Sequence, residues 1–250
     1  MSLLAGRGVT KRFGGLVALD RLDFEVRQGE VVGLIGQNGA GKTTLLNTIT
    51  GVYRPEEGSI TFDGRELTRL GPDRIARLGI ARTFQIPQAF PSLTALENVM
   101  VPLAFGPPAC PLAEAEVRAG AALDAVGLGG KAGVLPRALT IAELRRLELA
   151  RTLASGARLI LLDEINAGLT GAEIREAVDL IERLRGQGMT VLMVEHVMRV
   201  IMSVSERIIV LHFGTKIAEG TPAEIARDLG VIRAYLGERR GARGADPAGR

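Results

Sequence analysis

The sequence predicts an α/β fold with a mainly parallel sheet at its core. The second half of the chain holds apolar, strand-like runs at Leu159–Leu162, Thr190–Val194 and Arg207–Leu211, and a helical pattern at Ala172–Arg185 separates the first two. Strands that alternate with helices are typical of parallel sheets, because a crossover helix returns the chain to the starting edge. An earlier apolar run, Val31–Ile35, leads into a glycine-rich loop and a helical stretch, which adds one more unit of this kind.

The N-terminal part is predicted to form antiparallel strands. Strand-like runs occur at Gly8–Phe13 and Leu22–Val26. A third run, Ser59–Phe62, ends in Asp63-Gly64, a dipeptide typical of tight hairpin turns. We therefore expect an antiparallel β subdomain beside the parallel core.

The pattern turns helical between about residues 88 and 154. Candidate helices lie at Leu93–Leu103, Ala113–Val126 and Ile141–Leu153. Together, the predicted strands and helices form a single domain over residues 1–237. The Arg- and Gly-rich tail, residues 238–250, has little apolar content and is predicted to be disordered.

Composition limits the alternatives. The chain has 250 residues, is 46% hydrophobic and carries a net charge of +3, so it is large enough for a full core. About +2 of that charge lies in the tail, and the nearly neutral remainder argues against a general nucleic-acid-binding surface. Cys110 is the sole cysteine, which excludes an internal disulfide. The run Val99–Ala113 is too short and proline-rich to span a bilayer.

A phosphate-binding loop is the strongest motif in the chain. The letters GQNGAGKTT match the pattern GxxxxGK[ST], follow the strand-like run Val31–Ile35 and precede a helical stretch, Thr44–Thr50. The loop backbone and the positive helix end suit phosphates, Lys42 adds a point charge, and the Thr43 hydroxyl can ligate Mg²⁺. We therefore predict a nucleoside triphosphate site formed by Gly36, Gln37, Asn38, Gly39, Ala40, Gly41, Lys42, Thr43 and Thr44.

Acidic residues follow two other predicted strands. Asp163 and Glu164 come after the first, at the carboxyl end where ligands of open α/β sheets bind. Asp163 is placed to hold Mg²⁺ through water, and Glu164 to polarise the water that attacks the γ-phosphate. Glu195 and His196 follow the second strand in the same way, and we expect His196 to contact the γ-phosphate.

With these motifs, the chain resembles the nucleotide-binding subunits of ABC transporters. The resemblance extends from Leu3 to about Glu238. The resemblance implies that Gln85, in ARTFQ, contacts Mg²⁺ at the hinge to the helical subdomain, and that His196 is the switch histidine. It also implies that Phe13, in KRFGG, stacks on adenine, although a core phenylalanine is the alternative. The segments ARTFQ, ENVMVPL and VIRAYLGE look most like ATPase subunits of branched-chain amino-acid importers.

Several positions depart from the family pattern. The LSGGQ-like segment, which would grip the γ-phosphate of the facing protomer, is replaced by Leu139-Thr140-Ile141-Ala142-Glu143, without its glycines and glutamine. Thr140 and Glu143 instead form a capping-box pattern, which satisfies a helix end locally. After Glu164, the usual proline is Ile165 and the usual aspartate is Thr170, which is equally well interpreted as a helix N-cap.

We therefore predict an α/β P-loop NTPase core with an antiparallel β subdomain and an inserted helical subdomain. The protein is expected to bind ATP and Mg²⁺ and to hydrolyse the ATP. The resemblance implies a peripheral protein on the cytoplasmic face of the membrane. Its implied partners are permease subunits, a second ATPase subunit or a second copy of this chain, and indirectly a solute-binding protein. The alternatives are a transporter of urea or amides and a regulatory ATP-binding subunit. A GTPase is disfavoured because the chain has no Asn-Lys pair for guanine recognition.

Overall fold

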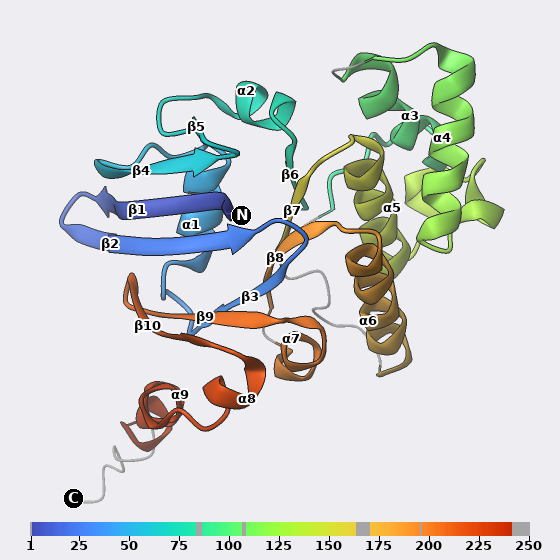
Figure 1. Cartoon of the computed structure of the whole chain (residues 1–250). Coiled ribbons are helices and arrows are strands. Elements are labelled where there is room, and N and C mark those ends of the chain that lie inside the picture. The colour runs from blue at the N-terminus through green and yellow to red at the C-terminus, as the bar shows by residue number, and fades with distance from the viewer. Residues whose placement is uncertain (1, 84–86, 107–108, 164–170, 196, 242–250) are drawn as a thin grey trace, which may run out of the picture.

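The computed structural model describes residues 2–83, 87–106, 109–163, 171–195 and 197–241. It contains two sheets with a helix between them and further helices on the outer side of the larger sheet (Figure 1).

The smaller sheet is antiparallel and has the order β2-β1-β4-β5. Its strands are β1 (Ser2–Phe13), β2 (Leu16–Arg27), β4 (Glu57–Phe62) and β5 (Arg65–Glu66). Asp63 and Gly64 connect β4 to β5 with positive φ values of 50° and 73°. Two central residues with positive φ define the hairpin turn that an Asp-Gly pair favours, so the predicted hairpin is confirmed.

The larger sheet has the order β10-β9-β3-β8-β7-β6. Its strands are β3 (Val31–Gly36), β6 (Ile80–Arg82), β7 (Leu159–Asp163), β8 (Thr190–Val194), β9 (Arg207–His212) and β10 (Thr215–Gly220). All neighbours pair in parallel except β9 and β10, which pair antiparallel at one edge. The predicted parallel core is confirmed, and β6 and β10 are additions to it.

The two faces of the larger sheet belong to two separate apolar clusters. Leu161 and Leu192 face the cluster shared with the antiparallel sheet and with α1 (Lys42–Ile49), whereas Ile160 and Met193 face the cluster shared with the outer helices. Successive side chains of a strand point to opposite faces. The strands are apolar on both faces because both faces are covered.

The outer helices include the three that the sequence predicts between residues 88 and 154. They are α3 (Ala95–Phe105), α4 (Leu112–Ala125) and α5 (Ile141–Ala154), and they pack against one another beside the sheet (Figure 1). The remaining helices are α2 (Pro72–Arg77), α6 (Gly171–Gly186), α7 (Met198–Val204), α8 (Pro222–Ile225) and α9 (Leu229–Gly241). None of the helices in the described ranges has the length and apolar character needed to cross a membrane.

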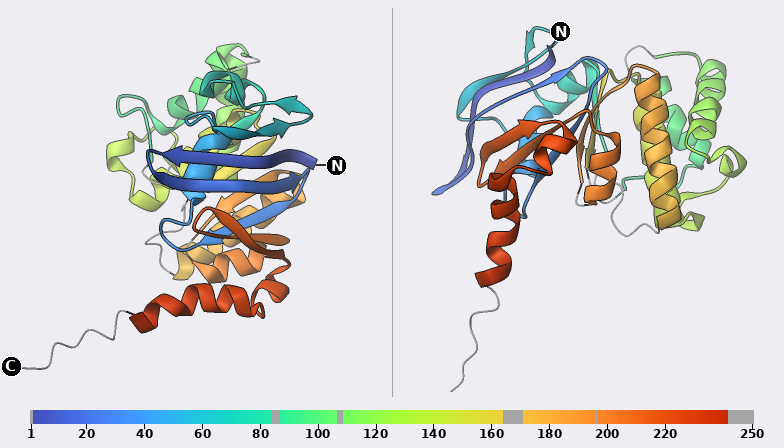
Figure 2. Two further views of the ribbon diagram at one scale, coloured as in Figure 1. Left: turned by 90° about the vertical axis from the view of Figure 1, so that its left-hand side faces the viewer. Right: turned by 60° about the horizontal axis from the view of Figure 1, so that its bottom comes forward.

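The C-terminal helices lie on the β9–β10 side of the molecule, away from α3 and α4 (Figure 2). Thr221 caps α8 in a capping box with Glu224. Helix α9 extends to Gly241, a few residues beyond the expected end of the folded part at residue 237. Its anchored first turns can propagate helical hydrogen bonds into the polar segment. Residues 242–250 lie outside the described part.

An ion-pair network lies at the edge of the larger sheet where the parallel strands begin. Arg207, the first residue of β9, donates to both carboxylate oxygens of Glu30 at 2.8 Å and also pairs with Glu219 of β10. Burial alone would raise the pKa of Glu30, but the hydrogen bond from Arg207 and the neighbouring positive charges hold this pKa below its ordinary value. The network joins the residue before β3 to β9 and β10.

Candidate functional site

The loop between β3 and α1 runs close to neighbouring strands, and two of its glycines have no room for a side chain. A Cβ on Gly36 would lie 2.4 Å from the carbonyl oxygen of Leu211, and one on Gly41 would lie 2.5 Å from that of Ala18. Gly41 also has φ +103°, in the region that favours glycine. Glycine at these positions lets the loop curl tightly at the carboxyl end of β3.

The ammonium group of Lys42 lies inside this loop. It donates hydrogen bonds to the carbonyl oxygens of Gly36, at 2.7 Å, and Gln37, at 3.0 Å. The residue is only 6% exposed. The loop therefore surrounds a buried positive charge, as a phosphate-binding loop requires.

The N-terminus of α1 has no side-chain cap. Its N-cap is Gly41, which has no side chain to bond to the first helical N–H groups. By contrast, α3, α5 and α8 each begin with a Thr-x-x-Glu capping box. The exposed Thr43 lies in the first turn of α1. This helix end keeps its positive dipole and its N–H groups directed at the loop, where an anion can accept from them.

Two acidic residues reach the same edge of the sheet from neighbouring strands. Asp163 ends β7 in register with Val194 of β8, and Glu195 follows directly. Because β7, β8 and β3 run parallel, Asp163 lies at the same edge of the sheet as the loop that follows β3. Both acidic residues are buried. Asp163 is the last residue of β7, and its role as a metal ligand stays a prediction.

Arg82 joins these parts, and the sequence did not reveal its role. Its guanidinium donates to Oδ2 of Asp163 and to Oδ1 of Asn47 on α1, both at 2.6 Å. The side chains of Arg82 and Asp163 are 7% and 6% exposed. The backbone N–H of Asp163 also donates to the hydroxyl of Thr83 at 3.2 Å. The carboxylate is therefore held in one orientation by β6 and α1 together.

The loop, Lys42 and Asp163 all lie in a part of the chain that matches a family of known proteins. The family model described as ABC transporter matches residues 19–167. The chain is an ABC transporter ATPase. A second model, described as branched-chain amino acid ATP-binding cassette transporter, matches residues 215–240 of this ATPase.

Its curated relatives match over nearly their full lengths. The high-affinity branched-chain amino acid transport ATP-binding protein LivG of Salmonella typhimurium is 42% identical, over 94% of this chain and 98% of the relative. The corresponding protein BraF of Pseudomonas aeruginosa is 41% identical with the same coverage.

Solved structures agree with the fold. A nucleotide-free ATP-binding cassette from an ABC transporter superposes with a TM-score of 0.85 at 28% identity, over 95% of this chain and all of that one. The dimeric post-hydrolysis cassette MJ0796, bound to ADP and Pi, superposes with a TM-score of 0.80 at 30% identity, over 88% of this chain and 98% of that one.

Other predicted site residues of the ATPase remain predictions. Gln85, Glu164, Thr170 and His196 lie outside the described residues. Phe13 is described: the residue is 42% exposed, and its ring packs edge-on with that of Tyr53, with the ring centroids 5.1 Å apart. The ring is therefore not part of the core, and one of its faces remains a candidate surface for adenine.

The altered segment before α5 forms the predicted capping box. Thr140 Oγ1 accepts from the N–H of Glu143 at 3.3 Å, and the N–H of Thr140 donates to Glu143 Oε2 at 3.0 Å. The ammonium of Lys131 donates to the other oxygen, Oε1, at 2.5 Å. The bond from Lys131, followed by that from Thr140, lowers the pKa of Glu143 below its ordinary value. The α5 N-terminus of the ATPase is thus satisfied within the chain.

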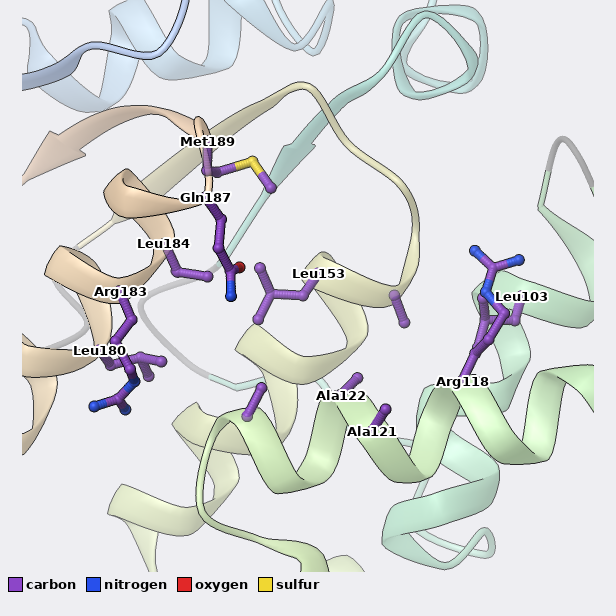
Figure 3. A pocket seen from close by; sticks show the side chains of 12 residues that line it. Leu103, Arg118, Ala121, Ala122, Leu153, Leu180, Arg183, Leu184, Gln187 and Met189 are labelled. Atoms are coloured by element: carbon purple, nitrogen blue, oxygen red, sulfur yellow. The ribbon is translucent and has the colours of Figure 1, made fainter.

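A separate hollow of about 430 Å³ lies among the outer helices. Its lining comes from α3, α4, α5, α6 and the segment that leads into β8, and it includes Leu153, Leu184 and Met189 (Figure 3). No residue of the phosphate loop contributes to it. This hollow is therefore not part of the nucleotide site of the ATPase.

Proposed function

We propose that this ATPase drives the import of branched-chain amino acids across a membrane. The open end of α1, with Lys42 inside the loop and Asp163 at the same sheet edge, carries the nucleotide part of this proposal. The substrate part is supported by the relatives LivG and BraF, which are named for branched-chain amino acid transport and match along nearly the whole chain.

The residues of the loop fit a nucleoside triphosphate with Mg²⁺. The first N–H groups of α1 and the ammonium of Lys42 would hold the outer phosphates. Thr43, Asp163 and Gln85 would hold the metal ion, partly through water. Mg²⁺ usually takes only one or two protein carboxylates and completes its shell with phosphates and waters, so the single carboxylate of Asp163 suits it. When bound, the ion neutralises charge on the phosphates.

The proposed hydrolysis assigns two further residues. Glu164 would orient and polarise the attacking water as a general base, and His196 would contact the γ-phosphate. Phe13 would stack on adenine. Arg82 would keep the neighbouring carboxylate of Asp163 fixed while the water is positioned, because its guanidinium spans Asp163 and Asn47.

The proposed assembly contains two ATPase subunits that close on nucleotide at the cytoplasmic face of the membrane. We propose that the second subunit is a different chain, with a more regular segment in place of Thr140–Glu143. The capping box and Lys131 occupy the groups that would otherwise face the phosphate of the partner cassette. Permease subunits, and indirectly a solute-binding protein, would complete the importer.

Transport assays test the substrate. We expect deletion of the gene to abolish high-affinity uptake of labelled leucine, isoleucine and valine, and re-expression of the wild-type gene to restore it. Labelled urea and short amides are the comparison solutes. Normal leucine uptake together with loss of urea or amide uptake would reassign the substrate and leave the ATPase function intact.

Two opposite charge changes test the role of the α5 segment. Glu143→Gln leaves the charge of Lys131 facing the partner cassette, so we expect stronger ATP-dependent dimerisation and a several-fold higher ATPase rate of the isolated chain. Lys131→Met exposes the charge of Glu143, and we expect the reverse, since a carboxylate repels phosphate. Glu97→Gln weakens the equivalent capping box of α3 and serves as control.

Sedimentation with ATP and steady-state turnover give the readouts. Strong homodimerisation of the wild-type chain, unchanged in both variants, would contradict the proposed need for a different partner. A mixed dimer whose turnover is unchanged when this chain carries Glu164→Gln would instead indicate a regulatory role.

A further inference from the structure

The hollow among the outer helices has the size of a small-molecule site. Its volume is about 430 Å³, and clefts that bind small molecules usually measure about 300–1,000 Å³. On one side α4 contributes three alanines, Ala121, Ala122 and Ala125, and on the other side α6 contributes two leucines, Leu180 and Leu184 (Figure 3). The alanine methyl groups are too short to fill the space between the two helices. The hollow therefore follows from the sequence of α4.

The lining is apolar in the middle and positively charged at its ends. Arg118 of α4 and Arg183 of α6 stand at opposite ends of the hollow, and Leu153 of α5 and Met189 lie between them (Figure 3). No aspartate or glutamate is among the described residues that line it. An occupant with an aliphatic body and a negative charge therefore complements the lining, whereas an ammonium group would find no carboxylate there.

The end of the hollow at α6 is the better site for the negative charge. Gln187 follows Arg183 by one helical turn, since its N–H donates to the carbonyl oxygen of Arg183 at 3.1 Å, and both side chains line the hollow. The amide of Gln187 extends toward Leu153 (Figure 3). At the other end, Arg118 already pairs with Glu114 at 3.4 Å. A carboxylate at the α6 end can accept hydrogen bonds from a guanidinium and from an amide.

We propose that this hollow binds an aliphatic monocarboxylate. The carboxylate lies at Arg183 and Gln187, and the hydrocarbon chain lies over Leu153, Leu184 and the alanines of α4. The ligand contacts α4 on one side and α6 on the other, so it connects the group of helices α3 to α5 with the helix between β7 and β8. The proposal depends neither on the nucleotide nor on the transported solute.

NMR of the methionine methyl groups locates the ligand. The chain has six methionines, and Met189 lines the hollow; a Met189→Leu variant assigns its resonance. We expect octanoate, kept below its micelle concentration, to shift the Met189 methyl resonance in a saturable way. Octylammonium has the same hydrocarbon chain with the opposite charge, and we expect it to bind at least about tenfold more weakly.

Two pairs of variants test the two parts of the site. Ala122→Leu fills the hollow, and we expect it to weaken octanoate binding at least about tenfold. Its control is Ala113→Leu, at an exposed position of the same helix outside the lining. Arg183→Gln removes the charge, and we expect about fivefold weaker binding of octanoate but an unchanged affinity for octanol, which carries no charge. Its control is Arg185→Gln, which is also exposed and outside the lining.

Chain length and branching identify the ligand within its class. From butanoate to octanoate, each added methylene should tighten binding about threefold, the gain expected when most of a CH₂ group is buried. Fatty acids and branched 2-oxo acids share the proposed chemistry, so hexanoate is compared with 4-methyl-2-oxopentanoate, and the tighter of the two indicates the source. Leucine carries an ammonium group beside its carboxylate and should bind more weakly than the oxo acid.

The proposal would be overturned if none of these carboxylates shifts the Met189 resonance in a saturable way. Octylammonium that binds as tightly as octanoate would also overturn it, as would wild-type affinity for octanoate in both Ala122→Leu and Arg183→Gln. Unfolding curves confirm that each compared variant is folded. Loss of ATP binding or of leucine uptake bears on the proposed function alone.

Discussion

Replacing Arg82 by Met is expected to destabilise the protein strongly. The substitution keeps an unbranched side chain of similar length and removes the guanidinium that binds Asp163 and Asn47. The carboxylate of Asp163 would then remain in a buried position without its charged partner. We also expect turnover to fall, because the orientation of Asp163 at the proposed metal site is no longer fixed.

The size of the effect follows from burial. The two charged side chains are 7% and 6% exposed, and breaking one side of a buried pair typically costs about 3–5 kcal/mol. Arg118 and Glu114 on α4 give the contrast, since their side chains are 47% and 56% exposed. An exposed pair one helical turn apart contributes only about 0.3–0.5 kcal/mol. We therefore expect about 3 kcal/mol or more for Arg82→Met and under about 1 kcal/mol for Arg118→Met.

Urea unfolding of the nucleotide-free chain measures both values. The double variant Arg82→Met/Asp163→Asn is expected to regain part of the lost stability, because no uncompensated charge is left in the interior. A free energy of unfolding for Arg82→Met within 1 kcal/mol of the wild type would refute the reasoning. So would a double variant that is less stable than Arg82→Met alone.

Four further predictions concern the loop, the hydrolysis and the ion-pair network where the parallel strands begin. Lys42→Ala should abolish tight ATP binding, whereas Glu164→Gln should keep binding and lower turnover at least about a hundredfold; unimpaired hydrolysis by Glu164→Gln would contradict its role. Arg207→Met should cost about 3–5 kcal/mol of unfolding free energy in urea, because it leaves Glu30 buried and unpaired. Since the folded-state pKa of Glu30 is lowered, its contribution is complete above about pH 4.5 and is lost as pH falls further. The urea midpoint should therefore drop on acidification, and less steeply in Glu30→Gln.

Periodicity predicted those elements whose burial is regular. The strands of the parallel core and the helices α3 to α5 were found within a few residues of their ends, because each buries a continuous apolar face. Strand β6 has only three residues, too few to show a period. Strand β10 is a largely exposed edge strand with no apolar alternation. Neither carries the signal on which such a prediction depends.

For the site too, the sequence predicts the features that are local in the chain and misses the contacts between distant residues. The phosphate loop is continuous in the sequence, so its motif could be recognised locally, and the capping box at Thr140 spans only four residues. Arg82 and Asp163 are 81 positions apart, and Gln37 and Ala234, which are joined by a hydrogen bond, are 197 positions apart. Nothing in the local pattern pairs them, because the pairing is created by strand order and by the docking of α9.

The network around Glu30 and Arg207 lies where the parallel strands begin, at the opposite end of β3 from the phosphate loop. A strand of this length separates the two by about 20 Å. A substitution in this network would reduce the number of folded molecules. Each molecule that does fold would hydrolyse ATP at the normal rate. Lower growth temperature or higher expression would then restore transport. A substitution of Arg82 lowers the ATPase rate of every folded molecule. A larger amount of protein would therefore not restore the normal rate per molecule.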